Sequence, residues 1–364
     1  MRIITWNMRR ATETSAAWKM LTDLDPDVAL LQEVSNIPKN IKELFDIKFH
    51  KATGKTGKPQ KFGTAVFVKG KIIDELPLSS EYDWVNQELE FFKGNFVGCI
   101  VQPQNHGPVR VVSVYSPAWP VDKDRLNGID VSPVKLKLNP NVWGTEIIWS
   151  ALKHLVSGNE SWVVGGDYNI SETFDIEWQD KNKVRFGIRS HGSPEILDRM
   201  HNLGFTECLR GYNDKIVPTF KHPRGKVEHQ IDHLFVTNDL YSRIQTCSVG
   251  DRSIIFGSSL SDHLPIIADF KDNRDIPPDI EEFIIRNKWV FAKTMSEIPH
   301  YYIVRDNLSE NDKMLFDEFG ALIKRKGHTE SFHSKQYTYF NIGNYKYWVI
   351  GNVLNRAELG LENK

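Results

Sequence analysis

The chain has 364 residues, a formal net charge of −1 and 40% hydrophobic residues. At about 150 residues per domain, this length predicts two domains, or one large domain with an appendage. The ordinary apolar content excludes a disordered chain, and the lack of an apolar run of about 18 residues excludes a membrane span. A protein this close to neutral does not hold polyanions by bulk charge, so a nucleic-acid partner would require local basic patches.

The amino terminus and the cysteines predict a cytoplasmic protein. The first seven residues, Met1–Asn7, contain no apolar core followed by a small-residue cleavage site, so we interpret them as a strand rather than a signal peptide. Cys99, Cys208 and Cys247 are far apart and odd in number, which fits neither a disulfide framework nor a zinc site. Reduced, buried thiols are typical of the cytoplasm.

The first three quarters of the chain alternate apolar runs with helical patterns, which predicts an α/β or α+β fold. Helices are expected over residues 14–24, 142–156 and 193–204, the last beginning at Ser193-Pro194, a pair typical of a helix start. Several apolar runs are continuous rather than alternating, as in sheets covered on both faces. The expected strands are Ile3–Trp6, Val28–Gln32, Thr64–Val68, Val97–Val101, Val109–Tyr115, Trp162–Gly166, Ile231–Val236 and Leu264–Asp269.

A charged stretch that ends in two prolines, residues 271–278, predicts a domain boundary after Phe270. We therefore expect a main domain over residues 1–272 and a small accessory α+β domain, rich in aromatic residues, over residues 279–364.

The accessory region contains one strong helix signal and one hairpin signal. A capping-box pattern opens at Ser309 and predicts a helix that ends at Gly327. Two alternating segments, residues 336–342 and 345–350, are separated by Gly343-Asn344, which is typical of a hairpin turn.

Two polar residues follow the first two expected strands. Asn7 comes directly after Trp6, where an asparagine is more often a turn former than a functional group. Glu33 comes directly after the apolar run 28–32, where a carboxylate must be solvated, paired or bound to a metal because an unpaired buried charge is costly. A salt-bridged strand end and a metal ligand are equally compatible with Glu33.

Three further motifs place acids, an amide and histidines at strand ends. In Gly165-Gly166-Asp167-Tyr168-Asn169, the glycines allow a sharp turn or the close approach of a ligand. Asp167 and Asn169 could face one site, although an ordinary turn is the alternative. Asp232-His233 leads into a strand, and Asp262-His263 suits a metal ligand beside a phosphate-binding imidazole, or else a polar loop.

These candidates are mainly oxygen donors at strand edges, without cysteine. Hard oxygen ligands suit Mg²⁺, with Mn²⁺ as the alternative, rather than structural zinc. The sequence contains no Gly-x-x-x-x-Gly-Lys-[Ser/Thr] loop, Rossmann glycine pattern or Gly-x-Ser-x-Gly elbow, which removes the common nucleotide-binding and serine-hydrolase classes. The candidates are Asn7, Glu33, Asp167, Asn169, Asp232, Asp262 and His263.

The order of five motifs resembles the endonuclease/exonuclease/phosphatase superfamily, the fold of deoxyribonuclease I, exonuclease III and the apurinic endonucleases. The resemblance covers residues 1 to about 272 and is nearest the exonuclease III and apurinic endonuclease branch. It implies a four-layer α/β sandwich, with two packed mixed sheets flanked by helices. The motifs are Thr5-Trp6-Asn7, Leu31-Gln32-Glu33, Gly166-Asp167-Tyr168-Asn169, Ile231-Asp232-His233 and Ser261-Asp262-His263.

The resemblance also implies Mg²⁺-dependent hydrolysis of a phosphodiester or a phosphomonoester. Glu33 would be the main metal ligand, with Asn7 and Asp262 near the metal or bound to it through water. The metal would neutralise the phosphate and activate the nucleophile or the leaving group.

The catalytic roles implied by the resemblance fall on five residues. Asp167 would position or deprotonate the attacking water, and Asn169 would hold a phosphate oxygen or help to orient the nucleophile. His263 would donate to the scissile phosphate, while Asp232 would orient His263 and favour its imidazolium form. Tyr115 looks like the tyrosine that contacts the phosphate in the exonuclease III branch.

The sequence departs from that branch at two positions. Arg9 stands where the branch carries an acid; it cannot ligate a metal, although Arg9 and Arg10 could meet phosphate. Ala118 stands where the branch carries an asparagine, and both differences weaken an apurinic-site assignment. The inositol-phosphatase branch is disfavoured because its arginine after Gly-Asp-x-Asn is replaced here by Ile170-Ser171-Glu172.

Three groups of basic residues lie outside these motifs. Such runs are usually solvated faces, but three of them in a phosphodiesterase fold favour a polyanionic substrate whose binding weakens with salt. Lys221 and Arg224 are expected to bind substrate because their group precedes Asp232, whereas the first group is expected in a surface loop. The groups are Lys48, His50, Lys51, Lys55, Lys58 and Lys61; Lys181, Lys183, Arg185, Arg189 and His191; and Lys221, His222, Arg224, Lys226 and His229.

We therefore expect a metal-dependent nuclease that acts on DNA, with RNA within the same chemistry. The alternatives are a phosphatase or phosphodiesterase for a small or lipid phosphate ester, and a non-catalytic nucleic-acid-binding module. The accessory region is expected to guide substrate choice or to dock a protein partner; its aromatic residues could form a core or stack on bases.

Overall fold

The computed structural model describes most of the chain as two compact units. One unit comprises residues 1–104 and 108–271, and the other comprises residues 105–107 and 272–364. None of the helices in the described part is long and apolar enough to cross a membrane. The described residues are 1–104, 106–137, 139–156, 160–175, 192–271, 278–287, 290–294, 310–325, 331–333, 338–342 and 345–350.

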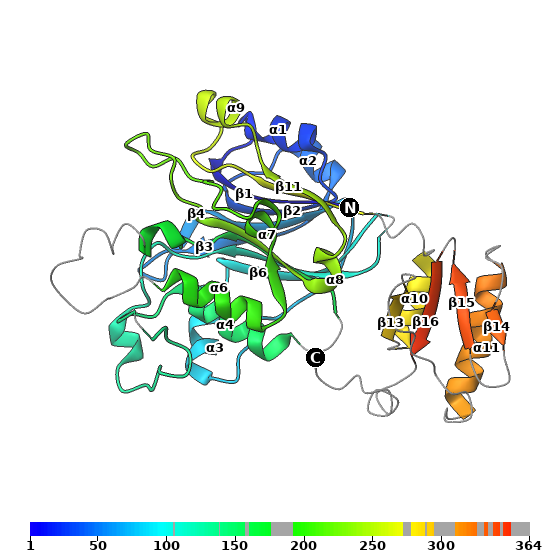
Figure 1. Cartoon of the computed structure of the whole chain (residues 1–364). Coiled ribbons are helices and arrows are strands. Elements are labelled where there is room, and N and C mark those ends of the chain that lie inside the picture. Colours follow the sequence, from blue (N-terminus) through cyan, green and yellow to red (C-terminus); the bar gives the residue numbers. More distant parts are fainter. Residues whose placement is uncertain are drawn as a thin grey trace. The chain divides into compact units, whose positions relative to one another are not determined.

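The first sheet of the larger unit has the strand order β11-β12-β1-β2-β4-β3 (Figure 1). β1 and β2 are parallel and the other neighbours are antiparallel. Asn7 on β1 pairs with Gln32 on β2. Asn7 and Glu33, which is the residue after Gln32, therefore reach the same edge of the sheet. The strands are β1 (Arg2–Ala11), β2 (Val28–Val34), β3 (Asp46–Thr53), β4 (Pro59–Val68), β11 (Ile244–Val249) and β12 (Ile266–Phe270).

The second sheet has the strand order β5-β6-β7-β8-β10-β9. β7 and β8 are parallel, with Tyr115 opposite Asp167, while β10 runs antiparallel to β8, with Asp232 opposite Asp167. Three candidate side chains therefore stand in one row across the sheet. The strands are β5 (Gly70–Glu75), β6 (Phe96–Pro103), β7 (Val109–Tyr115), β8 (Trp162–Asp167), β9 (Phe205–Glu207) and β10 (Asp232–Thr237).

Three apolar clusters arrange the two sheets and their helices in four layers. One cluster, which includes Leu30 and Val163, lies between the sheets. A second joins Trp18 of α1 to the outer face of the first sheet, and a third joins Ile147 of α4 to the outer face of the second. The predicted four-layer α/β sandwich is confirmed. The helices in the second cluster are α1 (Ala17–Leu24), α2 (Lys39–Leu44) and α9 (Arg252–Gly257). Those in the third are α3 (Asp83–Phe91), α4 (Gly144–Leu155) and α6 (Ser193–Asn202), and η1 (Lys123–Leu126) packs against it. α7 (Cys208–Asn213) and α8 (Asn238–Tyr241) contribute to the first cluster.

Two adjacent glycines lie within β8, directly before Asp167. Both are buried in the strand, so they do not form the turn that the sequence suggested. A Cβ at Gly166 would lie 1.8 Å from the carbonyl oxygen of Val114, and one at Gly165 would lie 2.9 Å from Leu234 of β10. The glycines therefore let β7 and β8 approach each other closely where Asp167 must be placed.

All eight expected strands are present, β7 with the expected ends and the other seven with shifted ends, but β3, β5, β9 and β11 were not expected. The first basic group lies on the β3–β4 hairpin, formed by residues 46–53 and 59–68. Lys55 and Lys58 lie in its exposed loop, as predicted, whereas the loop prediction was wrong for the members on the strands, Lys48, His50, Lys51 and Lys61. β3 is an edge strand, and its half-exposed polar residues hide the strand pattern. The second group falls within residues 176–191, which lie outside the described residues.

The smaller unit is an α+β arrangement, as predicted. The described residues of this unit form four antiparallel strands in the order β13-β16-β15-β14, and the expected hairpin corresponds to β15 and β16. The rings of Phe283 and Phe319, from its two helices, lie 5.3 Å apart. The elements are α10 (Pro278–Arg286), β13 (Val290–Thr294), α11 (Glu310–Arg325), β14 (Ser331–His333), β15 (Thr338–Ile342) and β16 (Tyr345–Ile350).

Candidate active site

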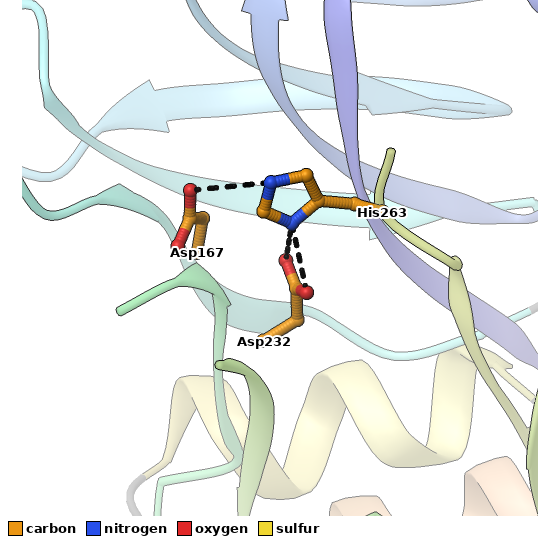
Figure 2. A group of neighbouring side chains, drawn as sticks. All are labelled: Asp167, Asp232 and His263. Atoms are coloured by element: carbon orange, nitrogen blue, oxygen red, sulfur yellow. Dashed lines mark hydrogen bonds and ion pairs between the residues drawn. The ribbon is translucent and has the colours of Figure 1, made fainter. Parts of the chain in front are cut away.

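Three buried side chains, Asp167, Asp232 and His263, form the centre of the candidate site (Figure 2). The imidazole lies between the two carboxylates: Nδ1 is 3.0 and 3.1 Å from the Asp232 oxygens, and Nε2 is 4.0 Å from Asp167 Oδ2. Burial alone would lower the pKa of His263, but the two carboxylates outweigh it and raise that pKa to about 10. The two carboxylates therefore favour the protonated form of His263, and Asp232 orients the ring through Nδ1.

Asp167 is the most tightly held carboxylate of the site. Its Oδ2 accepts a hydrogen bond from Asn7 Nδ2 at 3.0 Å, and its Oδ1 accepts one from the backbone N–H of Asn169 at 3.0 Å. Burial raises the pKa of Asp167 above its ordinary value, and the neighbouring Asp232 raises it further, whereas His263 and Asn7 oppose the shift. The Asn169 side chain is fixed in turn, because its Nδ2 donates to the Ser116 carbonyl oxygen at 2.8 Å.

Two residues that the sequence analysis did not single out hold His263 in place. Trp6 Nε1 donates to the His263 carbonyl oxygen at 2.9 Å. Ser261 Oγ donates to the Asn7 carbonyl oxygen at 2.7 Å and accepts from the His263 N–H at 3.0 Å. Both stand inside the recognised motifs, next to residues with predicted roles, and that position is the signal that could have identified them.

Glu33 and Tyr115 form a second, more open part of the site. The Tyr115 hydroxyl donates to Glu33 Oε1 at 3.2 Å, and Glu33 Oε2 lies 3.6 Å from Arg10 Nε. Burial, followed by the charge of Glu33, raises the pKa of Tyr115, so this group remains a hydrogen-bond donor. The guanidinium of Arg10 also lies 5.2 Å from the ring of Phe62, which packs edge-on against Tyr115 at 5.7 Å.

Four residues of the site adopt left-handed backbone conformations. The φ values are +46° and +59° for Arg9 and Arg10, +51° for Glu33 and +52° for Asn169. This region costs a residue with a side chain about 1 to 2 kcal/mol, and such strain is concentrated at functional sites. The pairing of β1 with β2 also shifts register between Asn7 and Ala11, a bulge that carries the two arginines.

Asp262 connects the site to the third basic group. Its Oδ2 lies 3.8 Å from Arg9 Nε, and its carbonyl oxygen accepts a hydrogen bond from the Lys221 N–H at 2.8 Å. Arg224 is exposed in the turn that follows, so both predicted substrate-binding residues lie on a segment bonded to the site. The Lys221 ammonium, however, is 5.7 Å from the ring of Phe256, which places it toward α9.

The same segment contributes a residue that the sequence analysis missed. The ring of Phe220 packs against the ring of His263 at 4.9 Å, and its backbone bridges those of His229 and His263. In the sequence, the position of Phe220 beside the predicted substrate-binding residue Lys221 is the feature that could have indicated this contact.

Two separate groups of side chains could hold a divalent metal. Ligand atoms of Asp167, Asp232 and His263 lie within 4.8 Å of one another. However, both His263 nitrogens already face carboxylates. This group therefore suits a protonated histidine side chain better than a bound metal ion. The predicted ligands Glu33 and Asp262 are carboxylates that meet arginines only at 3.6 and 3.8 Å, and such partly exposed oxygen donors fit Mg²⁺ or Mn²⁺.

A cavity of about 30 Å³ lies behind Asn169 and is lined by Glu146, Trp143, Phe174 and Ser193 among others. The Glu146 side chain is completely buried. Its Oε2 accepts hydrogen bonds from the Trp143 N–H at 3.1 Å and the Thr145 hydroxyl at 3.0 Å. Within the described part of the chain, Glu146 Oε1 has no hydrogen-bond partner.

Comparisons with known proteins agree with this arrangement. The model of the endonuclease/exonuclease/phosphatase family matches residues 4–263. None of the curated proteins matches the sequence. An apurinic endonuclease from Archaeoglobus fulgidus is 19% identical with a TM-score of 0.53, over 74% of this chain and 99% of that one. A single-residue variant of the 3′ phosphatase NExo from Neisseria, bound to a product DNA hairpin, has the same identity and coverage with a TM-score of 0.51. These likenesses support the fold.

Proposed function

Because the chain belongs to the endonuclease/exonuclease/phosphatase family, we propose that it is a divalent-metal-dependent phosphodiester hydrolase that cleaves DNA. The observation that carries this proposal is the imidazole of His263, held between two buried carboxylates beside the more open carboxylates Glu33 and Asp262. A positive donor next to a cation site suits a reaction in which negative charge grows on a phosphate.

His263 and Asp167 carry the proton chemistry in this proposal. His263 Nε2 donates to a non-bridging phosphate oxygen, while Asp232 holds Nδ1 and so fixes the ring. Asp167, held by Asn7 and by the Asn169 N–H, positions the attacking water and accepts its proton. The oxygen of the water then bonds to phosphorus as the bond to the leaving sugar oxygen breaks, and the leaving oxygen takes a proton from solvent water. The Asn169 side-chain oxygen and the Tyr115 hydroxyl orient the phosphate.

Glu33, Asp262 and the side-chain oxygen of Asn7 would hold the cation, Mg²⁺ or Mn²⁺. When bound, the cation neutralises phosphate charge and lowers the pKa of bound water. The three residues belong to β1, β2 and the segment before β12, and these three strands are neighbours in the first sheet, which supports a shared site.

A nucleic-acid substrate is supported by the basic segment next to His263. Backbone hydrogen bonds tie this segment to Asp262 and Leu264, and Arg224 is exposed at its turn. Two proteins of similar fold, the apurinic endonuclease and the DNA-bound 3′ phosphatase, are DNA-processing enzymes by their names. DNA is therefore the favoured polymer.

The smaller unit is proposed to guide substrate choice. A chain that ends at residue 274 would retain the predicted main domain and lose the accessory region. We expect this truncation to change the preference among nucleic-acid substrates. Unchanged activity together with unchanged preference would contradict the proposed role.

The proposed activity is tested with supercoiled plasmid, linear duplex, single strands and RNA, each with Mg²⁺, Mn²⁺ or EDTA. We expect DNA cleavage that requires the metal and is lost in His263→Ala, because that variant lacks the imidazolium donor. Cleavage that survives in EDTA or in the variant would refute the mechanism. A protein that cuts no polymer but hydrolyses small phosphate esters would belong to the alternative class, phosphatases.

A further inference from the structure

Arg9 and Arg10 carry two permanent positive charges at the place where a divalent metal is proposed to bind. Each guanidinium faces a different carboxylate: Arg9 Nε is 3.8 Å from Asp262 Oδ2, and Arg10 Nε is 3.6 Å from Glu33 Oε2. The site therefore contains one positive charge for each of the two carboxylates. A metal ion that approaches Glu33 and Asp262 meets repulsion that these ligands alone would not cause.

Both arginines extend toward this edge of the sheet from an unfavourable backbone conformation. Arg9 and Arg10 are consecutive, both have positive φ, and they form the bulge between Asn7 and Ala11. Asn7 Oδ1 accepts the Arg9 N–H at 3.0 Å, and the Ser35 hydroxyl donates to the Arg10 carbonyl oxygen at 3.2 Å. Specific hydrogen bonds thus hold the strained conformation and fix the backbone positions from which the two side chains extend.

The guanidinium ends, in contrast, are free to change partners. Their side chains are 54% and 70% exposed, and both carboxylate distances exceed those of a direct hydrogen bond. A phosphate accepts two parallel hydrogen bonds from one guanidinium, which is a stronger interaction than a solvated ion pair at these distances. Phosphate is therefore the better partner for either arginine.

We propose that Arg9 and Arg10 make the binding of the metal and of the nucleic acid cooperative. Without substrate, the arginines neutralise Asp262 and Glu33 and weaken metal binding. When the phosphates of nucleic acid take over the guanidiniums, the two carboxylates regain their full charge for the cation. Because linkage is reciprocal, the metal must then strengthen nucleic-acid binding by the same factor. This inference rests on the proposed function and adds a coupling between its two ligands.

The test measures equilibrium binding rather than turnover, in the full-length protein. A fluorescent phosphorothioate DNA oligonucleotide, which keeps the phosphate charge, is titrated by anisotropy with and without Mn²⁺. Binding of Mn²⁺ alone is measured by electron paramagnetic resonance of the free ion. The variant is Arg9→Asn with Arg10→Asn, because asparagine tolerates positive φ and carries no charge.

We expect Mn²⁺ to tighten oligonucleotide binding by the wild-type protein about tenfold, a coupling of about 1.4 kcal/mol. The double variant is expected to bind Mn²⁺ alone about tenfold more tightly, and to show a coupling of less than about threefold. Arg9→Lys with Arg10→Lys keeps the charges and should leave Mn²⁺ binding weak. Lys19→Gln with Lys39→Gln removes two exposed charges from α1 and α2 and should behave as the wild type.

The inference would be overturned if the asparagine variant bound Mn²⁺ no more tightly than the wild type. It would also be overturned if the coupling survived in that variant. In either case the wild-type protein would still bind Mn²⁺ and cleave DNA. A wild-type protein that binds no Mn²⁺ and cleaves nothing would instead refute the proposed function, so the two failures are distinguishable.

Discussion

Glu146, at the start of α4, is expected to make the larger unit less stable as the pH rises. Its carboxyl group is completely buried and hydrogen-bonded through Oε2 only, so burial raises its pKa to about 7 more strongly than the hydrogen bonds lower it. Glu146→Gln keeps the size and the hydrogen-bonding ability of the side chain but cannot ionise. The substitution is therefore expected to remove a pH dependence and leave the fold intact.

The direction of this pH dependence follows from the protonation of Glu146 in the folded and in the unfolded chain. In the unfolded chain Glu146 ionises near its ordinary pKa of 4.5, whereas in the folded chain it keeps its proton up to about pH 7. Between these values the folded state binds the extra proton, so the free energy of unfolding decreases as the pH rises through that window. A difference of about 2.5 pKa units corresponds to about 3 kcal/mol.

The measurement is urea unfolding of the full-length protein at pH 5, 6, 7 and 8. We expect Glu146→Gln to gain stability relative to the wild type by about 3 kcal/mol between pH 5 and pH 8. Glu43→Gln, which removes an exposed carboxylate on α2, is the matched control and should give a profile parallel to the wild type. Parallel profiles for both variants would refute the reasoning and would mean that the Glu146 carboxylate is solvated inside its cavity.

Three further predictions concern the site and its support. Asp232→Asn should lower the single-turnover cleavage rate about 100- to 1,000-fold while DNA affinity is retained, because His263 loses its carboxylate partner; an unchanged rate would contradict that role. Gly166→Ala should lower the free energy of unfolding by about 1 to 3 kcal/mol in urea, whereas Gly257→Ala, with open space around it, should not. Arg224→Ala should reduce the slope of log affinity against log salt by about one, and an unchanged slope would place that arginine away from the DNA.

The positions of the main site residues could be predicted because they follow apolar runs. Asp167 ends β8, Asp232 begins β10 and Glu33 is the last residue but one of β2, and strand ends meet at one edge of a sheet. Asn7 follows the predicted apolar run but lies inside β1, which continues to Ala11. The sequence pattern reports burial along a strand, so it locates such ends well. The residues predicted from motifs and those that the structure brings together agree closely for this reason.

The missed strands and supporting contacts have a different origin. β3 and β5 are edge strands whose exposed polar residues break the apolar pattern, and β9 is only three residues long. The hydrogen bond from Trp6 to His263 joins residues far apart in sequence, so no local pattern announces it. The same holds for the left-handed conformation of Arg9, because arginine rarely adopts it and the bulge that requires it depends on the neighbouring strand.

The first strand of the chain finds one of its partners near the end of the larger unit. β1 pairs with β12, and Trp6 bonds to His263 across 257 residues of sequence. During synthesis, the amino-terminal motif therefore leaves the ribosome long before the strand that completes its sheet. His263 cannot join Asp167 and Asp232 until the segment before β12 has been made. A growing polypeptide therefore carries no complete candidate site before His263 has been made, because His263 lies between Asp167 and Asp232.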